Sequence, residues 1–154
     1  RVLQEGLEMD VHQVATHLSN PSVVIAATAS GFYLSGDHGC TFTCQSNGIV
    51  CPYQRACACF VDADIYLVST SKGPHGCVEA QLYRSENAGK DWELVEGLPK
   101  NIDRNIDTFQ IIIIGGACAL VIIEDTVLYE TSDWGMTWNN IGEGYPKLSG
   151  ALVL

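Results

Sequence analysis

The sequence predicts an all-β protein built from a repeated unit, and three observations support this prediction. Runs of five to eight residues rich in β-forming side chains are separated by short turn segments. No long stretch shows the 3.6-residue periodicity of an amphipathic helix. An eleven-residue segment also recurs three times, at intervals of 50 and 46 residues. A period of this length is the signature of a repeat architecture.

The repeated segments align without gaps: FYLSGDHGCTF at 32–42, LYRSENAGKDW at 82–92 and LYETSDWGMTW at 128–138. Each reads apolar, Tyr, any, Ser/Thr, any, Asp/Asn, any, Gly, any, any, aromatic. A second landmark, Glu-Gly-Leu or a close variant, keeps the same rhythm. Its glycines, at positions 6, 48, 97 and 144, lie 42, 49 and 47 residues apart. Two landmarks with one period establish the repeat.

The residue types of the repeated segment are those of a tight turn between two strands. Glycine supplies a positive φ, and the Asp or Asn side chain accepts hydrogen bonds from nearby backbone N–H groups, as the Ser or Thr hydroxyl also can. The aromatic residue starts the returning strand with a large apolar side chain to bury. We therefore assign this structural role to Ser35, Asp37, Gly39, Phe42, Ser85, Asn87, Gly89, Trp92, Thr131, Asp133, Gly135 and Trp138.

The remainder of each unit supplies further strands in order. The first unit offers strands at 11–18 and 23–29, separated by the turn SNPS. The second offers 55–63 and 64–71, followed by the Gly- and Pro-bearing loop KGPHG. The third offers 107–114 and 117–123, separated by a Gly-Gly turn, and a run at 126–132. Each unit thus provides strands before its repeated turn and one after it.

The repeated turn resembles the Asp-box, or BNR repeat, whose pattern is Ser/Thr-x-Asp-x-Gly-x-x-Trp/Phe. Asn87 replaces the usual Asp, and Phe42 the usual Trp. In that family the box joins the third and fourth strands of a four-stranded antiparallel β-propeller blade. The resemblance covers nearly the whole chain. It implies complete blades at 10–50, 51–99 and 100–146, a partial blade at 1–9 and the start of another at 147–154.

Three blades are fewer than the four to eight with which propellers close. The predicted propeller is therefore incomplete as a single chain, and its two outer sheet edges would be unpaired. Two solutions are open. The sequence is a segment of a longer propeller, which we favour, or a homo-oligomer completes the propeller by supplying blades from a second chain.

Composition excludes several classes of partner. The net charge of −10, with eight Lys plus Arg against eighteen Asp plus Glu, offers no basic surface, so no nucleic acid partner is predicted. The longest apolar runs, 111–123 and 23–29, are interrupted by Gly or too short to span a bilayer, so no membrane insertion is predicted. The segment at 1–10 has no signal-peptide pattern, which leaves the compartment unknown.

Seven cysteines are present, and five of them lie within twenty residues: Cys40, Cys44, Cys51, Cys57 and Cys59. None of their spacings gives the CxxC knuckle typical of zinc sites. Ordinary buried thiols are the first interpretation, since Cys57 and Cys59 alternate as on one face of a strand. A Cys44–Cys51 disulfide is the second and a metal site the third. We predict no metal and no cofactor.

Members of the Asp-box family include sialidases and other glycoside hydrolases, sortilin-type receptor domains and a photosystem II assembly factor. The box does not choose among them, because it lies on the blade periphery. A sialidase would need three arginines around a carboxylate and an Arg-Ile-Pro motif. This chain has only Arg1, Arg55, Arg84 and Arg104, and no Arg-Ile-Pro. Sialidase activity is therefore not expected of it.

Two aspartates are the candidate catalytic residues of a glycoside hydrolase. Asp10 and Asp107 precede innermost strands in the matching contexts DVHQV and DTFQI, and two carboxylates can act as acid and as base or nucleophile. The simpler interpretation, which we favour, is that repeated aspartates start repeated strands and accept from turn N–H groups. The chain is accordingly predicted to be a binding or assembly scaffold. The alternative is a propeller-type glycoside hydrolase or carbohydrate-binding protein.

Three further residues are candidate contacts for a protein or carbohydrate ligand. Trp134 occupies the variable position at the tip of its turn, where an indole suits stacking on a sugar or a partner. His38 occupies the same position of the first unit, and His12 lies near the expected axial channel. The alternative for Trp134 is that it covers a neighbouring loop.

Overall fold

A computed structural model describes residues 5–100 and 102–151, and these residues form three four-stranded antiparallel sheets. The first sheet contains β1 (Val11–Thr16), β2 (Val24–Thr28), β3 (Phe32–Ser35) and β4 (Thr43–Cys44). The second contains β5 (Tyr53–Cys59), β6 (Tyr66–Ser71), β7 (Gln81–Ser85) and β8 (Glu93–Leu94). The third contains β9 (Ile111–Gly115), β10 (Cys118–Ile123), β11 (Val127–Thr131) and β12 (Asn139–Gly142).

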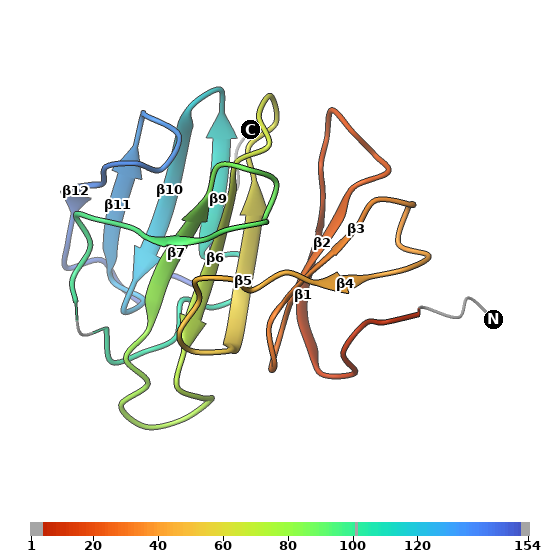
Figure 1. Cartoon of the computed structure of the whole chain (residues 1–154). Coiled ribbons are helices and arrows are strands. Elements are labelled where there is room, and N and C mark those ends of the chain that lie inside the picture. The colour runs from red at the N-terminus through yellow and green to blue at the C-terminus, as the bar shows by residue number, and fades with distance from the viewer. Residues whose placement is uncertain (1–4, 101, 152–154) are drawn as a thin grey trace.

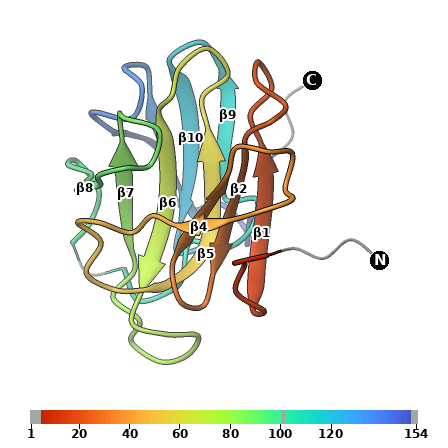
Figure 2. The ribbon, with the colours of Figure 1, turned by 45° about the vertical axis from the view of Figure 1, so that its right-hand side comes forward.

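The strands of each sheet neighbour one another in chain order, as in the blade of a propeller. Figure 1 shows the three blades side by side, with β5–β8 between the other two. The first strands of the three blades lie close together, since β5 contacts β1, β2 and β9. In Figure 2 the first blade comes forward, with β1 and β2 beside β5. The prediction of an all-β, incomplete propeller is confirmed.

The sheets lie within the ranges 10–50, 51–99 and 100–146 predicted for the three units. The unit boundaries themselves stay a prediction, and part of the predicted partial blades, at 1–4 and 152–154, lies outside the described residues. Among the described residues no helix is long and apolar enough to cross a membrane.

The repeated turn joins the third and fourth strands of each blade, and its hydrogen bonds explain its residue types. In the first blade Ser35 Oγ accepts from Gly39 N at 2.9 Å and donates to Asp37 Oδ1 at 2.7 Å. Asp37 in turn accepts from the backbone N–H and the hydroxyl of Thr41, at 2.8 and 2.7 Å. Phe42 directly precedes β4. The polar residues of the turn are thus used to hold its backbone.

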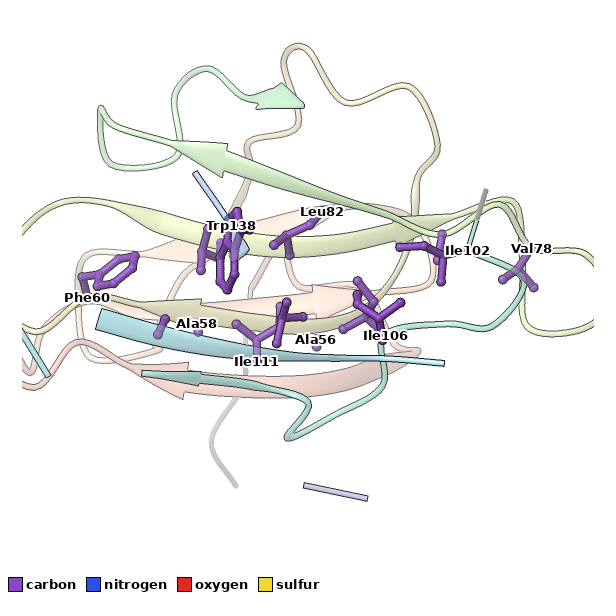
Figure 3. Close-up of a cluster of buried hydrophobic side chains, with 14 residues drawn as sticks. Ala56, Ala58, Phe60, Val78, Leu82, Ile102, Ile106, Ile111 and Trp138 are labelled. Carbon is purple, nitrogen blue, oxygen red and sulfur yellow. The ribbon is translucent and has the colours of Figure 1, made fainter. Parts of the chain in front are cut away.

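Two apolar cores fill the spaces between blades. One packs Ile25, Ala27 and Phe32 of the first blade against the second blade. The other lies between the second and third blades and is drawn in Figure 3, where the labelled side chains extend from Phe60 at one end to Val78 at the other. Trp92 and Trp138 each face the preceding blade and are 4% exposed. In the second and third blades the aromatic of the repeated turn therefore seals the contact with the blade before it.

Three glycines of the second landmark lie where the chain passes close to the repeated turn of the next blade. Gly6, Gly48 and Gly97 all have positive φ, and a Cβ added to each would meet the carbonyl oxygen of the next turn's aromatic residue, at 2.3, 2.3 and 2.9 Å. Those aromatic residues are Phe42, Trp92 and Trp138. Only glycine permits so close an approach of the two main chains.

All seven cysteines are free thiols. The buried-thiol interpretation is correct for Cys57 and Cys59, whose side chains are buried between the first two blades. It is wrong for Cys40 and Cys44, which are exposed because they lie at the repeated turn and on the outermost strand. The structure contains no Cys44–Cys51 disulfide. Within the described residues, no group of three or more His, Cys, Asp or Glu could hold a metal.

Candidate functional site

The axial ends of the inner strands carry the candidate site. Thr108, just before β9, donates its hydroxyl to the carbonyl oxygens of His12 at 3.3 Å and of Arg55 at 3.0 Å. This one side chain therefore connects the starts of β1 and β5 with the segment that leads into β9. Because β1, β5 and β9 belong to different blades, the site is assembled from all three repeats.

Asp107 is held by the second blade. Arg55 donates Nε to Asp107 Oδ1 at 2.8 Å and Nη1 to the Tyr53 hydroxyl at 3.2 Å. Partial burial alone would lower the pKa of Arg55. The hydrogen bonds to Asp107 and Tyr53 and the negative charge of Asp107 outweigh this effect, and the pKa of Arg55 is raised. The Asp107 backbone N–H is bound separately, by Gln110 Oε1 at 2.7 Å. Asp107 is thus fixed twice, because its main-chain N–H donates to Gln110 and its carboxylate accepts from Arg55.

Asp125 anchors the other half of the site. It lies in the turn between β10 and β11, is 7% exposed, and accepts from Gln110 at 2.9 Å and from Arg104 at 2.7 Å. Lys147 Nζ lies 3.7 Å from the same carboxylate. Burial tends to raise the pKa of Asp125, yet the bonds from Gln110 and Arg104 and the two positive charges outweigh it and lower that pKa.

These residues line two adjoining clefts, one of about 320 Å³ and one of about 280 Å³. Arg55, Asp107, Asp125 and Lys147 line both of them, so we describe the two together as the axial cleft. Its walls carry charges of both signs. A larger cleft of about 550 Å³ lies against β7 and β8 and is lined chiefly by apolar side chains and the backbone of residues 94–100. It brings no comparable set of ionisable groups together.

The sequence-predicted site residues are placed as follows. Asp10 and His12 lie at the start of β1, with His12 Nε2 3.4 Å from Asp10 Oδ1 and Asp10 largely exposed. His12 Nδ1 is hydrogen-bonded to the Gln54 carbonyl, and its ring lies 4.9 Å from that of Tyr53. His12 is therefore held against the second blade, next to the ion pair of Arg55 and Asp107.

The turn-tip residues do not reach the axial cleft. The indole of Trp134 packs edge-on against Phe60, with ring centroids 5.4 Å apart, as part of the core between the second and third blades. This contact matches the alternative interpretation, in which Trp134 covers a neighbouring element. His38 is exposed at the tip of the first blade, and its ligand contact stays a prediction.

Arg55, Arg104, Asp125 and Lys147 were missed by sequence reasoning. One signal was present: Arg55 is the only charged residue of the otherwise small and apolar run RACACF. A lone arginine at the start of a buried strand indicates a nearby acceptor. For Asp125 and Lys147 no local signal exists, because their neighbours come from distant parts of the chain.

Comparisons with known proteins identify the fold. No model of a known protein family and no curated protein matches this sequence. Among solved structures, the GH74 xyloglucanase from Xanthomonas campestris superposes with a TM-score of 0.68 at 19% identity, over 84% of this chain and 20% of its own. YCF48 bound to a D1 peptide gives a TM-score of 0.64 at 13% identity, over 90% of this chain and 42% of its own.

YCF48 from Cyanidioschyzon merolae gives a TM-score of 0.59 at 17% identity, over 86% of this chain and 37% of its own. The chain therefore spans less than half the length of each of these proteins. At these identities the similarity establishes the β-propeller fold and assigns no activity.

Proposed function

We propose that the chain is an Asp-box β-propeller segment that acts as a binding or assembly scaffold, and that the axial cleft receives a segment of a partner protein. The observation that carries the proposal is the meeting of Arg55, Asp107, Asp125 and Lys147 around one cleft. Hydrogen-bonded ion pairs hold Arg55, Asp107 and Asp125 in place, as preorganised recognition requires, and Lys147 Nζ lies 3.7 Å from Asp125.

The charge distribution supports a peptide as the occupant. The chain has eight Lys plus Arg and a net charge of −10, yet Arg55, Arg104 and Lys147 line this one cleft. A peptide offers carboxylates and carbonyls to such cations, and amides and amines to Asp107 and Asp125. YCF48, which shares the fold, has been solved with a bound D1 peptide. That ligand belongs to YCF48. Because the two proteins share a fold, the YCF48 complex supports a peptide rather than a sugar as the occupant of the axial cleft.

The proposal is tested with an array of 12-residue peptides probed with the purified chain. Peptides that bind should lose at least tenfold in affinity with Arg55→Ala, since truncating one partner of a buried hydrogen-bonded charge pair typically costs about 2 kcal/mol or more. Lys147→Ala removes an exposed charge and should weaken binding less. Lys90→Ala, in the exposed repeated turn of the second blade, is the matched control and should bind unchanged. Binding that is equal in all variants would place the ligand elsewhere, and no binding peptide at all would contradict the proposal.

A glycoside hydrolase is the second candidate, and one observation favours it. The hydroxyl of Thr108 ties the Asp107 segment to the start of β1, next to which Asp10 lies. Two carboxylates at the same end of inner strands could flank a glycosidic bond. Under this hypothesis Asp10 and Asp107 would serve as acid and as base or nucleophile.

Hydrolysis of xyloglucan and of other β-glucans, followed by reducing-sugar release, separates the two candidates. The scaffold proposal expects no release by the chain. The enzyme hypothesis expects release that the double substitution Asp10→Asn, Asp107→Asn abolishes. If a measured activity persists unchanged in the double variant, the enzyme hypothesis with these residues is wrong.

A further inference from the structure

The segment that follows β4 is tied to the repeated turn of the second blade by one residue. Asn47 Nδ2 donates to Asp91 Oδ1 at 2.6 Å, and the Asn47 carbonyl accepts from Trp92 N at 3.0 Å. At the repeated turn of the first blade the same place is taken by Glu5, which forms a short parallel bridge with Thr41. Asn47 therefore connects two neighbouring blades through both its side chain and its main chain.

The residue types at this contact differ from those at the two corresponding ones. There a glutamate lies before the landmark glycine and the turn carries a threonine: Glu5 with Thr41, and Glu96 with Thr137. Here the turn presents Asp91, so a glutamate at position 47 would set two carboxylates against each other, whereas the amide of Asn47 supplies a donor. Gly48 is required as well, because a Cβ on it would meet Trp92 O at 2.3 Å. The contact thus produces the only Asn-Gly sequence in the chain.

An asparagine followed by glycine can lose its side-chain amide in a reaction that needs only water. The main-chain nitrogen of Gly48 attacks Asn47 Cγ, the bond from Cγ to Nδ2 breaks, and Nδ2 leaves as ammonia with the proton of the Gly48 nitrogen. Water then opens the five-membered imide at either carbonyl, which gives aspartate or isoaspartate. Glycine favours the first step, because no Cβ crowds its nitrogen. Both residues are exposed, so water reaches them.

The folded chain holds Asn47 away from the geometry that this reaction needs. Ile49 N donates to Ser46 O at 3.1 Å across the turn. Gly48 has a φ of +94°, whereas the φ of Asn47 is not positive, and this combination defines a type II turn. The first central residue of such a turn has a ψ of about +120°. This ψ turns the Asn47 Cβ away from the Gly48 nitrogen, while closure of the imide requires the two atoms to be eclipsed.

The two hydrogen bonds to the second blade keep this arrangement in place. The Trp92 N–H fixes the carbonyl of Asn47, and with it ψ, while the Asp91 carboxylate fixes the side-chain amide. Both bonds have to break before Asn47 Cγ and the Gly48 nitrogen can meet. Imide formation therefore depends on local opening of the contact between the first two blades.

We propose that Asn47 is a deamidation site of this chain and that its contact with Asp91 controls the reaction. While the amide donates to Asp91 it is retained. When the contact opens and the imide forms, the product carries a carboxylate, and closing the contact again places that carboxylate against Asp91 with no donor between them. The reaction thus converts a transient opening into a permanent weakening of one blade interface. This proposal is independent of any ligand in the axial cleft.

The first test compares the reaction inside and outside the fold. The full chain and a capped peptide of residues 45–50 are incubated in the same mildly alkaline buffer, and isoaspartate is located by peptide mapping with mass spectrometry. In the chain, position 47 should react before any other asparagine, but about tenfold or more slowly than in the peptide, because only the opened fraction reacts. An equal rate in chain and peptide, or earlier reaction at another asparagine, would overturn the proposal.

The second test removes the partner of the amide. Asp91→Ala should raise the rate at position 47 about fivefold, the change in the opening equilibrium expected from one lost hydrogen bond. Asn87→Ala is the matched control, since it removes the other amide that donates to Asp91, at 2.9 Å, and leaves the bond from Asn47 in place. Equal acceleration by the two variants, or none by Asp91→Ala, would contradict control by Asp91. The comparison with the peptide stands even if Asp91→Ala fails to fold.

The third test concerns the product. Asn47→Asp introduces the carboxylate directly, so its urea midpoint at neutral pH should lie below that of the parent chain. Adding Asp91→Asn restores a pair of one amide and one carboxylate with the roles exchanged, and should recover most of the loss. A midpoint for Asn47→Asp equal to that of the parent chain would show that the modified contact is no weaker, and the proposed consequence would be wrong.

Discussion

At the level of single residues, the side-chain hydrogen bond that spans the repeated turn is made by two different pairs of residue types. In the first and third blades an aspartate accepts from a threonine hydroxyl, as Asp133 does from Thr137 at 2.6 Å. In the second blade the roles are exchanged, because Asn87 Nδ2 donates to Asp91 Oδ2 at 2.9 Å. The asparagine that departs from the Asp-box pattern is therefore matched by a compensating aspartate four residues later.

This pairing predicts that the two positions are energetically coupled. Asn87→Asp alone would place two carboxylates against each other and should destabilise the chain by about 1 kcal/mol, the usual size of one exposed hydrogen-bond or charge effect. Adding Asp91→Thr recreates the arrangement of the other blades and should restore most of the loss. Urea unfolding of the two single variants and the double variant measures the coupling. Additive effects would show that the pair does not interact.

The pH dependence of stability follows from Asp37. The Thr41 backbone N–H, the Thr41 hydroxyl and the Ser35 hydroxyl lower the pKa of Asp37 from 3.8 to about 2. The unfolded chain therefore binds this proton more readily than the folded chain. The stabilisation is fully present above about pH 4 and is lost as the pH falls through about 2.

Asp37→Asn removes this titration. Between about pH 4 and pH 2, the urea midpoint of the Asp37→Asn variant should therefore fall less steeply than the midpoint of the parent chain. Asp62→Asn, in an exposed loop, is the control. A slope that is the same for the parent chain and Asp37→Asn would contradict the assigned cause.

At the level of elements, β5 shows how a strand between two blades buries both faces. Ala56 and Ala58 pack against the third blade, while Cys57 and Cys59 pack against the first. Small side chains on both faces allow the blades to approach closely near the axis. Desolvation by burial raises the pKa of Cys57 to about 12 and that of Cys59 to about 11. Neither thiol is available as a thiolate near neutral pH.

The thiols should consequently divide into two classes. At pH 8, dithionitrobenzoate should modify the exposed Cys40 and Cys44 within minutes, while Cys57 and Cys59 react only when the chain unfolds. Peptide mapping after alkylation identifies the modified positions. A Cys57→Ala, Cys59→Ala variant should keep the fast phase of the parent chain and lose two thiols from the total in denaturant. Modification of Cys57 at the rate of Cys40 would disprove the packing of β5.

At the level of the whole molecule, local pattern and long-range assembly differ in how well the sequence predicts them. The turn at 35–42 and the glycine at 48 carry their own geometry in their residue types, so the blades could be predicted. The axial cleft could not, since Asp125 and Arg104 meet only through the packing of the third blade's ends. Trp134 and His38 occupy the same position of the repeat. Trp134 is covered because the second blade lies beside it, whereas no described blade precedes the first, and His38 is exposed.

The apolar cores form only between neighbouring blades, so the stability of the molecule should be close to a sum of nearest-neighbour terms, with the hydrogen bond from Thr108 to His12 as a link between the first and third blades. The side chains of one core lie between the first and second blades, and those of the other between the second and third. Leu82, from β7, belongs to the second of these cores and is 2% exposed, while Val68, from β6, belongs to the first and is fully buried. Truncating either should weaken one interface and leave the other intact.

Hydrogen exchange measured by mass spectrometry can resolve this difference. Leu82→Ala should cost about 2–5 kcal/mol and raise exchange in β10 and β11 far more than in β2 and β3. Val68→Ala, a smaller truncation in the other core, should show the reverse ranking. The third blade would then open separately from the first, as expected if stability is passed only between neighbours. An equal rise in all three sheets for both variants would instead mean that the blades unfold as one cooperative unit.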